Sequence, residues 1–254
     1  MKAHPPDLPP SYRSEYFEEI DSTNSEALRR ARAGEAAGLW IFAGRQKDGR
    51  GRDGRSWVSE PGNLHASLLL RPACNLQTAA QLSLVAGVAA LDAVRALTDS
   101  AGKKLDLGLK WPNDLLLDGE KLGGILLESS TAPSSEDIYV IIGTGLNLAS
   151  HPELDDIVAT NLALYGHNAA PHDALIALAW STQKWLDIWH QGENFNCIRK
   201  EWLARAIGLG KSIRVKHGGE EIRGLFDSLD ENGALLLDCG EDGLRRITVG
   251  DVFF

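Results

Sequence analysis

Cysteine is scarce in this sequence, and its scarcity argues against two common ways of stabilising a fold. Only three of the 254 residues are cysteines, Cys74, Cys197 and Cys239, and no two of them have C-x-x-C spacing. A disulfide framework or a zinc site is signalled by paired cysteines at short spacings. The histidines show no H-E-x-x-H or other ligand spacing either. The sequence therefore suggests neither disulfides nor a zinc site.

Long apolar runs and a basic balance are also lacking. The N-terminal stretch MKAHPPDLPPSYRSEY has no apolar core that a signal peptide would need. No window approaches the roughly 18 apolar residues expected of a membrane span. Asp and Glu number 35 against 26 Lys and Arg, a net charge of −9 that argues against general affinity for nucleic acid or anionic membranes. We expect a soluble cytoplasmic protein whose anion binding is local.

The composition is ordinary for a globular protein, and the length allows one large domain or a large and a small one. Residues 1–11 are proline-rich and are expected to be a flexible lead-in. After the glycines at 208 and 210, short strands and glycine turns replace longer elements. We therefore predict a main domain at 12–207 and a small barrel or sandwich at 208–254.

Patterns within the main domain predict alternating helices and strands. A helix begins near Asp21, with Thr23 and Glu26 as a capping box, and ends at Gly34. Further helices are expected at 78–97, 170–192 and 196–210, the second with Trp180, Trp185 and Trp189 facing the core. Buried strands are expected at 39–45, 64–72, 107–129 and 138–148, the third interrupted by an Asp-Gly hairpin turn at 118–119.

A glycine-arginine loop, DGRGRDGRSW at 48–57, follows the strand at 39–45. It contains G-x-G-x-x-G, but no helix follows as a dinucleotide fold requires. The loop does not continue into the G-K-[ST] of a Walker A loop, and the H-R-D and D-F-G signatures of protein kinases do not occur. Guanidinium groups suit phosphates and carboxylates, and glycines allow backbone N–H groups to approach an anion. The loop is interpreted as a flexible anion site, with a solvated basic surface loop as the alternative.

Three further segments carry polar residues beside apolar strands. In KWPNDLLLDGEK, Lys110 and Asp114 flank a proline and Lys121 begins the return strand. Because polar residues between apolar strands are costly, this pattern favours either a functional polar cluster or a surface hairpin with Lys–Asp pairing. GTGLN ends a central strand at Asn147. DSTN at 21–24 caps a helix whose N-terminus also offers free N–H groups to a ligand.

In order along the chain, DSTN, GRQKDGRGRDGRSW, GNLHASLLLRP, KWPNDLLLDGEKLGGILLES and IIGTGLNL resemble the signature of biotin protein ligases. The C-terminal GLFDSLDENGALLL resembles the small terminal barrel of that family. The resemblance implies an α+β fold: a mixed sheet of the class II aminoacyl-tRNA-synthetase type, followed by an SH3-like β-barrel. It also implies activation of biotin by MgATP to biotinyl-5′-AMP, and transfer to a lysine of a biotin carboxyl carrier protein.

The resemblance assigns roles to residues at matching positions. Recognition of the biotin ring would fall to Ser22, Thr23, Asn24 and Gln46. The loop that covers biotin and the adenylate would include Gly49, Arg50, Gly51 and Arg52. The pocket wall would be made by Trp57, Leu126 and the backbone at Gly143. Lys121 would meet the carboxylate and α-phosphate, while the nucleotide, its Mg²⁺ and the incoming lysine would be organised by Lys110, Asn113, Asp114, Asn147 and Arg52.

Two departures and two alternatives accompany this interpretation. His65 stands where most members carry tyrosine, and Asp53 lowers the positive charge of the loop. A lipoate or octanoate transferase or ligase of the same superfamily is the competing enzyme. A non-catalytic phosphate- or RNA-binding module is the competing binding protein, but it predicts a basic domain with exposed aromatics, which this sequence lacks. With little chain before DSTN, DNA binding is not expected, and monomer and homodimer both remain open.

Overall fold

A computed structural model describes the chain except for residues 1–5, 100–104, 132–136 and 154–157. Its centre is a seven-stranded sheet in the order β1-β2-β3-β7-β6-β5-β4, in which only β1 and β2 pair in parallel. The strands are β1 (Arg13–Ile20), β2 (Leu39–Gln46), β3 (Leu64–Leu70), β4 (Leu107–Lys110), β5 (Asp114–Leu117), β6 (Glu120–Thr131) and β7 (Ile138–Leu146).

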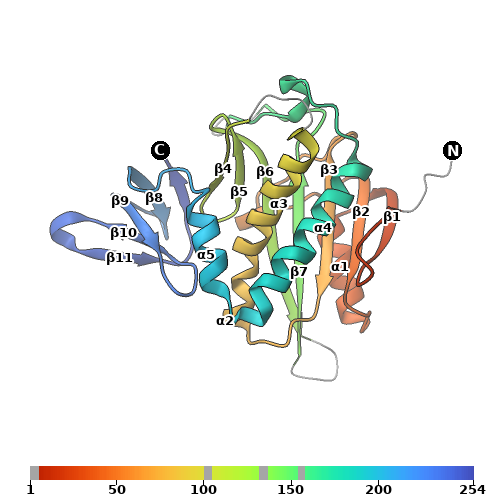
Figure 1. The fold of residues 1–254 in the computed structure, drawn as a ribbon, viewed down its shortest axis with the longest axis horizontal. Coiled ribbons are helices and arrows are strands. Elements are labelled where there is room, and N and C mark those ends of the chain that lie inside the picture. Colours follow the sequence, from red (N-terminus) through yellow and green to blue (C-terminus); the bar gives the residue numbers. More distant parts are fainter. Residues whose placement is uncertain (1–5, 100–104, 132–136, 154–157) are drawn as a thin grey trace.

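Helices cover both faces of this sheet (Figure 1). Alternating side chains divide the core: Leu39 and Ile41 pack with Ala27 and Ala31 on the face covered by α1, whereas the larger cluster around Trp40 lies on the opposite face. The helices are α1 (Thr23–Arg32), α2 (Leu76–Ala80), α3 (Leu82–Thr98), α4 (Pro171–Trp189) and α5 (Phe195–Leu203). On the face under α1, polar side chains of β3 and β6, Ser67 and Glu128, contact the first turn of the helix.

The C-terminal residues form a separate five-stranded antiparallel sheet in the order β11-β10-β9-β8-β12. It lies at the end of the molecule next to β4 and β5, with α5 between it and the other helices (Figure 1). Its strands are β8 (Ser212–His217), β9 (Glu220–Leu229), β10 (Leu235–Asp238), β11 (Leu244–Ile247) and β12 (Asp251–Phe253). Glycines with positive φ occupy turns between these strands at 218–219, 233 and 243, as the glycine-rich pattern after residue 208 predicts.

Most expected elements are present, and the Asp118-Gly119 turn joins β5 to β6 with positive φ at both residues. The helix expected at 78–97 is interrupted at Gln81, which separates α2 from α3. The helix expected at 196–210 ends at Leu203.

Two expectations about helices are wrong. The N-cap of α1 is Ser22, whose side chain accepts a hydrogen bond from Ser25 N, and not Thr23. Trp185 and Trp189 are buried in the core, but Trp180 is half exposed and its Nε1 donates to Asp7 O. This contact and one from Ser11 Oγ to Gln183 tether part of the segment expected to be flexible.

The expectation that no segment reaches the length and hydropathy of a membrane span is also wrong. The stretch Leu76–Thr98 is 23 residues long, and its most apolar window has a mean hydropathy of 1.4, which suffices by length and composition alone. Its most apolar window is 67% buried inside the protein, as is usual for the core helix of a globular domain.

Candidate active site

A pocket of about 440 Å³ opens on the α1 face of the sheet, between the start of α1, the glycine-arginine loop and the ends of β5, β6 and β7. Its floor passes over glycines where a side chain would collide with neighbours. A Cβ at Gly143 would strike the amide of Asn24, and one at Gly145 would strike the ring of Trp57. The missing side chains therefore make room for the pocket and let Asn24 and Trp57 pack against the strand.

The first turn of α1 presents hydrogen-bonding groups at one end of the pocket. Both the backbone N and Oγ1 of Thr23 donate to Gln46 Oε1, at 2.8 and 3.0 Å. Ser67 Oγ, on β3, lies 2.7 Å from Thr23 Oγ1 and 2.5 Å from Asn24 Oδ1. Ser22, Thr23 and Asn24 are buried, so this polar cluster is fixed by its own hydrogen bonds.

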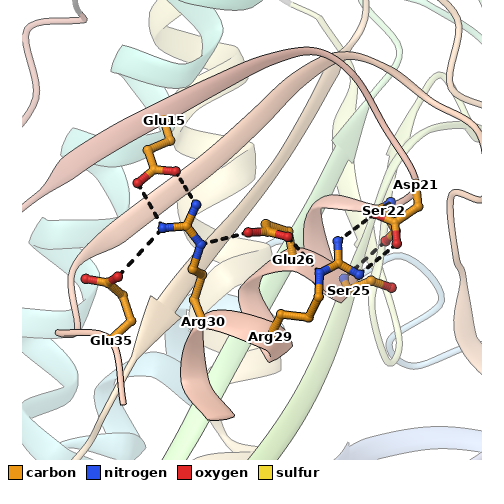
Figure 2. Close-up of polar contacts among 8 residues, drawn as sticks. All are labelled: Glu15, Asp21, Ser22, Ser25, Glu26, Arg29, Arg30 and Glu35. Carbon is orange, nitrogen blue, oxygen red and sulfur yellow. Dashed lines mark hydrogen bonds and ion pairs between the residues drawn. The ribbon is translucent and has the colours of Figure 1, made fainter. Parts of the chain in front are cut away.

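A network of ion pairs holds this turn from the outer side of α1 (Figure 2). Arg29 donates to both oxygens of Asp21, at 2.8 and 2.9 Å, and Asp21 Oδ1 accepts from Ser22 N at 2.7 Å. The hydrogen bond from Arg29 holds the pKa of Asp21 down at about 2. Arg30 joins Glu26 to Glu15 at 2.7 Å on the neighbouring strand β1. The network ties the DSTN segment to α1 and α1 to β1.

The glycine-arginine loop closes one side of the pocket. Gly49 O accepts from Trp57 N at 2.8 Å and Gly51 N donates to Arg55 O at 2.7 Å, so the loop folds back on itself as a narrow hairpin. A Cβ at Gly49 would collide with Trp57 O and Ser59, so only glycine fits at this position. Arg52 begins a short 3₁₀ turn in which Asp53 has φ 54°.

Two lysines and one carboxylate form the charged end of the pocket. Asp114 lies between Lys121, 2.7 Å away, and Lys110, 3.4 Å away. All three side chains are less than 20% exposed, so two cations share one anion in a partly buried site. Lys121 Nζ also lies 5.7 Å from the centre of the Trp57 ring. The cluster retains an excess of positive charge facing the cavity.

Amide side chains connect this charged end to the loop and to β7. Arg52 Nη1 donates to Asn113 Oδ1 at 3.0 Å, and Asn113 Nδ2 donates to Ile125 O at 2.6 Å. Asn147 is buried and donates to Thr160 O at 3.0 Å. The contacts of Asn113 set the position of Arg52 on the pocket wall.

The structure brings nearly all of the predicted site residues together. Each of them lines the pocket except Gly49, which shapes the loop from behind, and Lys110, which contacts it through Asp114. Contributions that the sequence analysis did not single out come from Ser67, Ser59, Glu128 and Asp251. Ser67 and Glu128 lie within quoted segments but among strand residues, Ser59 follows the glycine-arginine loop, and Asp251 lies in the C-terminal sheet. No local spacing signals their contacts.

His65 lies in the pocket wall and is buried. Its Nε2 is 3.2 Å from Glu60 O, and its Nδ1 is buried without a hydrogen-bond partner among the described residues. Burial lowers the pKa of His65 below its ordinary value of 6.5. The imidazole is therefore neutral near pH 7 and offers the pocket a flat, weakly polar surface.

Comparison of the sequence with protein families assigns both parts of the chain. The sequence model of the biotin/lipoate A/B protein ligase family matches residues 16–147. The model of the biotin protein ligase C-terminal domain matches residues 208–254. The chain belongs to the biotin protein ligase family.

Similar proteins agree with this assignment. A biotin–[acetyl-CoA-carboxylase] ligase of Paracoccus denitrificans is 40% identical over 244 residues, which cover 92% of this chain and 97% of that protein. Among solved structures, biotin protein ligase from Aquifex aeolicus in complex with biotin and ATP has a TM-score of 0.76 at 27% identity, covering 95% and 97% of the two chains. The Leishmania major ligase in complex with biotinyl-5-AMP has a TM-score of 0.66 at 26% identity, covering 95% and 100%.

These similarities confirm the expected fold class. The mixed sheet with helices corresponds to the synthetase-like catalytic domain of the family, and the five-stranded antiparallel sheet to its SH3-like terminal barrel. The match of a C-terminal domain described specifically as that of biotin protein ligases separates this chain from the lipoate branch named in the broader family.

Proposed function

We propose that the protein activates biotin with ATP and transfers it to a lysine of a biotin carboxyl carrier domain. In the first step an oxygen of the biotin carboxylate attacks the α-phosphorus, and the bond from phosphorus to the pyrophosphate oxygen breaks. In the second step the ε-amine of the acceptor lysine attacks the acyl carbon of biotinyl-5′-AMP. The bond from that carbon to the phosphate oxygen then breaks, AMP leaves, and the nitrogen loses a proton.

The single observation that carries the proposal is the polarity of the pocket. One end presents fixed donors and acceptors on Thr23, Asn24 and Gln46, suited to a cyclic urea with N–H and C=O groups. The other end presents Lys121 and Arg52, suited to a carboxylate and a phosphate. Biotin carries these two kinds of group at its two ends, so one cavity can orient the carboxylate toward the cations.

The charged end supplies what the first step needs. A carboxylate and a triphosphate repel one another, and negative charge builds on the phosphoryl oxygens as the transition state forms. Lys121, held by Asp114 and over Trp57, is a pre-positioned cation for both groups. Arg52, held by Asn113, would neutralise the phosphates from the loop side. Lys110 holds Asp114 from the side opposite Lys121.

Mg²⁺ fits this site as a companion of ATP. Among the described residues no three His, Cys, Asp or Glu side chains gather as a metal site. Asp114, a carboxylate in the pocket lining, is already shared by two lysines. Mg²⁺ is commonly held by substrate phosphates, one or two carboxylates and water. When bound it would screen phosphate charge, with Asp114 and Asn147 as the side chains that organise the nucleotide.

The loop would protect the intermediate. A mixed anhydride is lost to water, so closure over the adenylate favours transfer over hydrolysis. Gly49 lets the loop fold tightly against Trp57 and Ser59, Gly51 lines the pocket, and Arg50 and Arg52 give the loop anionic or protein partners. Trp57 anchors the end of the loop against the pocket floor.

Several finer features belong to the same proposal. We assign catalysis to residues 12–207 and the terminal barrel to 208–254, the two segments that carry the sheets described above. The partners would be biotin, ATP and a carrier domain such as that of acetyl-CoA carboxylase, with no nucleic acid or membrane. The protein would act in the cytoplasm as a monomer or homodimer.

Exchange of labelled pyrophosphate into ATP tests the first step. We expect exchange that depends on biotin and is absent with lipoate or octanoate, because a chain without the ureido ring makes no hydrogen bonds with the polar cluster of Thr23 and Asn24. A purified carrier domain should then receive biotin, and its Lys→Arg variant should not. Exchange supported by lipoate and not by biotin would overturn the proposal.

A further inference from the structure

We propose that Glu128, on β6, is a positioning residue that fixes both the amide of Asn24 and the glycine-arginine loop. The inference rests on the proposed function, since its consequences are measured on biotin and its adenylate. Glu128 does not line the pocket that holds the site. It lines a second cavity of about 740 Å³ on the outer side of the loop, near the C-terminal sheet. Its influence on the ligand must therefore pass through the residues it contacts.

One carboxylate oxygen makes both contacts. Glu128 Oε2 accepts from Asn24 Nδ2 at 2.8 Å and from Arg50 Nη2 at 2.7 Å. The donors come from the start of α1 and from the loop, 104 and 78 residues away in sequence. The side chain of Glu128 is 23% exposed, so water screens these contacts only in part. Glu128 is thus the point at which two separate parts of the site meet.

The contact decides which way the amide of Asn24 faces. An ionised carboxylate only accepts hydrogen bonds, so it selects the orientation in which Asn24 turns its NH₂ group toward β6. The oxygen of Asn24 then faces Ser67 Oγ, 2.5 Å away, and the pocket floor at Gly143. This orientation presents an acceptor to the ligand. Without Glu128 the orientation would be favoured by the Ser67 hydroxyl and by a 3.4 Å contact of Nδ2 with Leu126 O, with no charged partner for the NH₂ group.

The second contact fixes the loop at its first arginine. Arg50 also lies at an isolated bridge to Ser56, so its position is shared with the returning half of the loop. A charge-assisted hydrogen bond is stronger than a neutral one. Losing it would leave the loop held by its own backbone contacts, by Arg52 and by Arg55. One oxygen of Glu128 therefore fixes both the orientation of the Asn24 amide and the position of the loop that covers the ligand.

Two variants separate these effects. Glu128→Ala removes both contacts and should raise the KM for biotin about tenfold, the loss expected for one hydrogen bond to a charged group. It should also speed release of biotinyl-5′-AMP from the purified enzyme. Glu128→Gln keeps a carbonyl that can accept from Asn24 but loses the charge that attracts Arg50. Its biotin KM should stay within about threefold of wild type, while adenylate release remains fast.

Arg50→Ala and the double variants assign the contacts. Arg50→Ala should speed adenylate release, and adding Glu128→Gln should change release no further, because the two residues act on one contact. Glu221→Gln is the matched control. Glu221 is a carboxylate of comparable exposure on β9, paired with Arg223 at 3.0 Å and not among the pocket residues, and its loss should alter neither measurement.

Failure of the proposed function and failure of the inference about Glu128 give different results. If wild type shows no biotin-dependent exchange, the proposed function fails. If wild type is active but Glu128→Ala and Glu128→Gln both match Glu221→Gln in biotin KM and adenylate release, Glu128 is only a structural residue and the inference is overturned. A fall in kcat and thermal stability with unchanged KM and release would overturn it as well. If Glu128→Ala does not fold, Glu128→Gln and its additivity with Arg50→Ala decide the question.

Discussion

At the scale of single residues, the centre of the site is a carboxylate placed between two ammonium groups. Asp114 lies 2.7 Å from Lys121 and 3.4 Å from Lys110. The pair with Lys110 joins the end of β4 to the start of β5. A partly buried carboxylate paired with two lysines limits the rotamers of both. Lys121 is thus directed toward the pocket before any substrate enters, which reduces the reorganisation needed when phosphate charge develops.

We predict that Lys121→Gln lowers the rate of adenylate formation at least about 100-fold, because loss of one pre-positioned donor to a developing oxyanion costs that much in other enzymes. Pyrophosphate exchange at saturating biotin and ATP measures the effect. Biotin affinity by calorimetry should fall much less. Lys184→Gln is a suitable control, since Lys184 also pairs with a carboxylate, Asp92, and lies over a tryptophan ring. Equal losses in both variants would contradict the role given to Lys121.

His65 predicts a dependence of stability on pH. Burial lowers its pKa from 6.5 in the folded protein, so the unfolded chain binds the proton first as the pH falls. Its contribution to stability is complete above pH 6.5 and declines as the pH drops toward the folded-state pKa, by at most about 1.4 kcal/mol per pH unit. Urea unfolding of wild type and His65→Gln between pH 7.5 and 5 measures this. The difference in stability between the two should shift in favour of the variant at low pH, and a constant difference would contradict the assignment.

At the scale of elements, α4 shows how the position of a residue on a helix determines the cost of removing it. Trp189 is buried and its Nε1 donates to Gln81 Oε1 at 2.8 Å, which links α4 to the junction of α2 and α3. Trp180 lies nine residues earlier, on the opposite side of a helix that turns about 100° per residue. Its ring is half exposed against the N-terminal segment.

Trp189→Ala should therefore destabilise the protein by about 3–5 kcal/mol, the usual cost of removing a buried large aromatic. Trp180→Ala should cost about 1 kcal/mol or less, since it removes a half-exposed ring and one hydrogen bond. Chemical denaturation of the two variants measures the difference. Similar losses would show that the N-terminal segment contributes more to the fold than its contacts indicate.

The elements also show what the sequence could and could not predict. Apolar runs bounded by turns were sufficient for β2, β3, β7 and the Asp118-Gly119 hairpin, because these signals are local. The cap of α1 was misassigned because Ser22 and Thr23 both suit an N-cap, and a tertiary contact with Gln46 occupies Thr23. Trp180 was misplaced because an apolar helix with tryptophans on several faces resembles a buried one.

The site divides in the same way. Residues within contiguous motifs, such as Lys110 and Asp114 or Ser22 and Thr23, are found from their spacing and from the resemblance to a family. Glu128 lies at the end of an apolar run and reads as the polar limit of a strand. Its contacts with Asn24 and Arg50 exist only because β6 passes beneath both, which depends on sheet order and not on local sequence.

At the scale of the whole molecule, the C-terminal sheet takes part in building the site. Gly233 O accepts from Trp111 Nε1 at 3.1 Å, which docks a turn of the small sheet beside the K-W-P-N-D segment. The chain leading into β12 reaches the loop, where Gly250 O accepts from Arg52 at 3.4 Å and Asp251 pairs with Arg55 at 2.9 Å. The loop is thus held between β6 on one side and the small sheet on the other.

Arg52 and Arg55 should differ in importance for this reason. Arg52 is 17% exposed and lines the pocket beside Asn113, so we predict that Arg52→Ala severely impairs formation or retention of the adenylate, about 100-fold or more. Arg55 is 47% exposed and is directed at Asp251. Arg55→Ala should cost less than about tenfold, as expected for an exposed ion pair. Equal small effects would mean that the loop is only a solvated surface.

The pair formed by Arg55 and Asp251 then tests whether the small sheet holds the loop through charge. Asp251→Arg places two guanidinium groups together and should speed adenylate release more than Arg55→Ala does, because repulsion replaces an attraction. Adding Arg55→Asp to Asp251→Arg restores opposite charges, with the two residues exchanged, and should recover part of the retention. Recovery should weaken as salt rises, since the pair is exposed to solvent. If the double exchange releases the adenylate as fast as Asp251→Arg alone at low salt, the small sheet positions the loop through the hydrogen bond between Gly250 O and Arg52, and the ion pair is incidental.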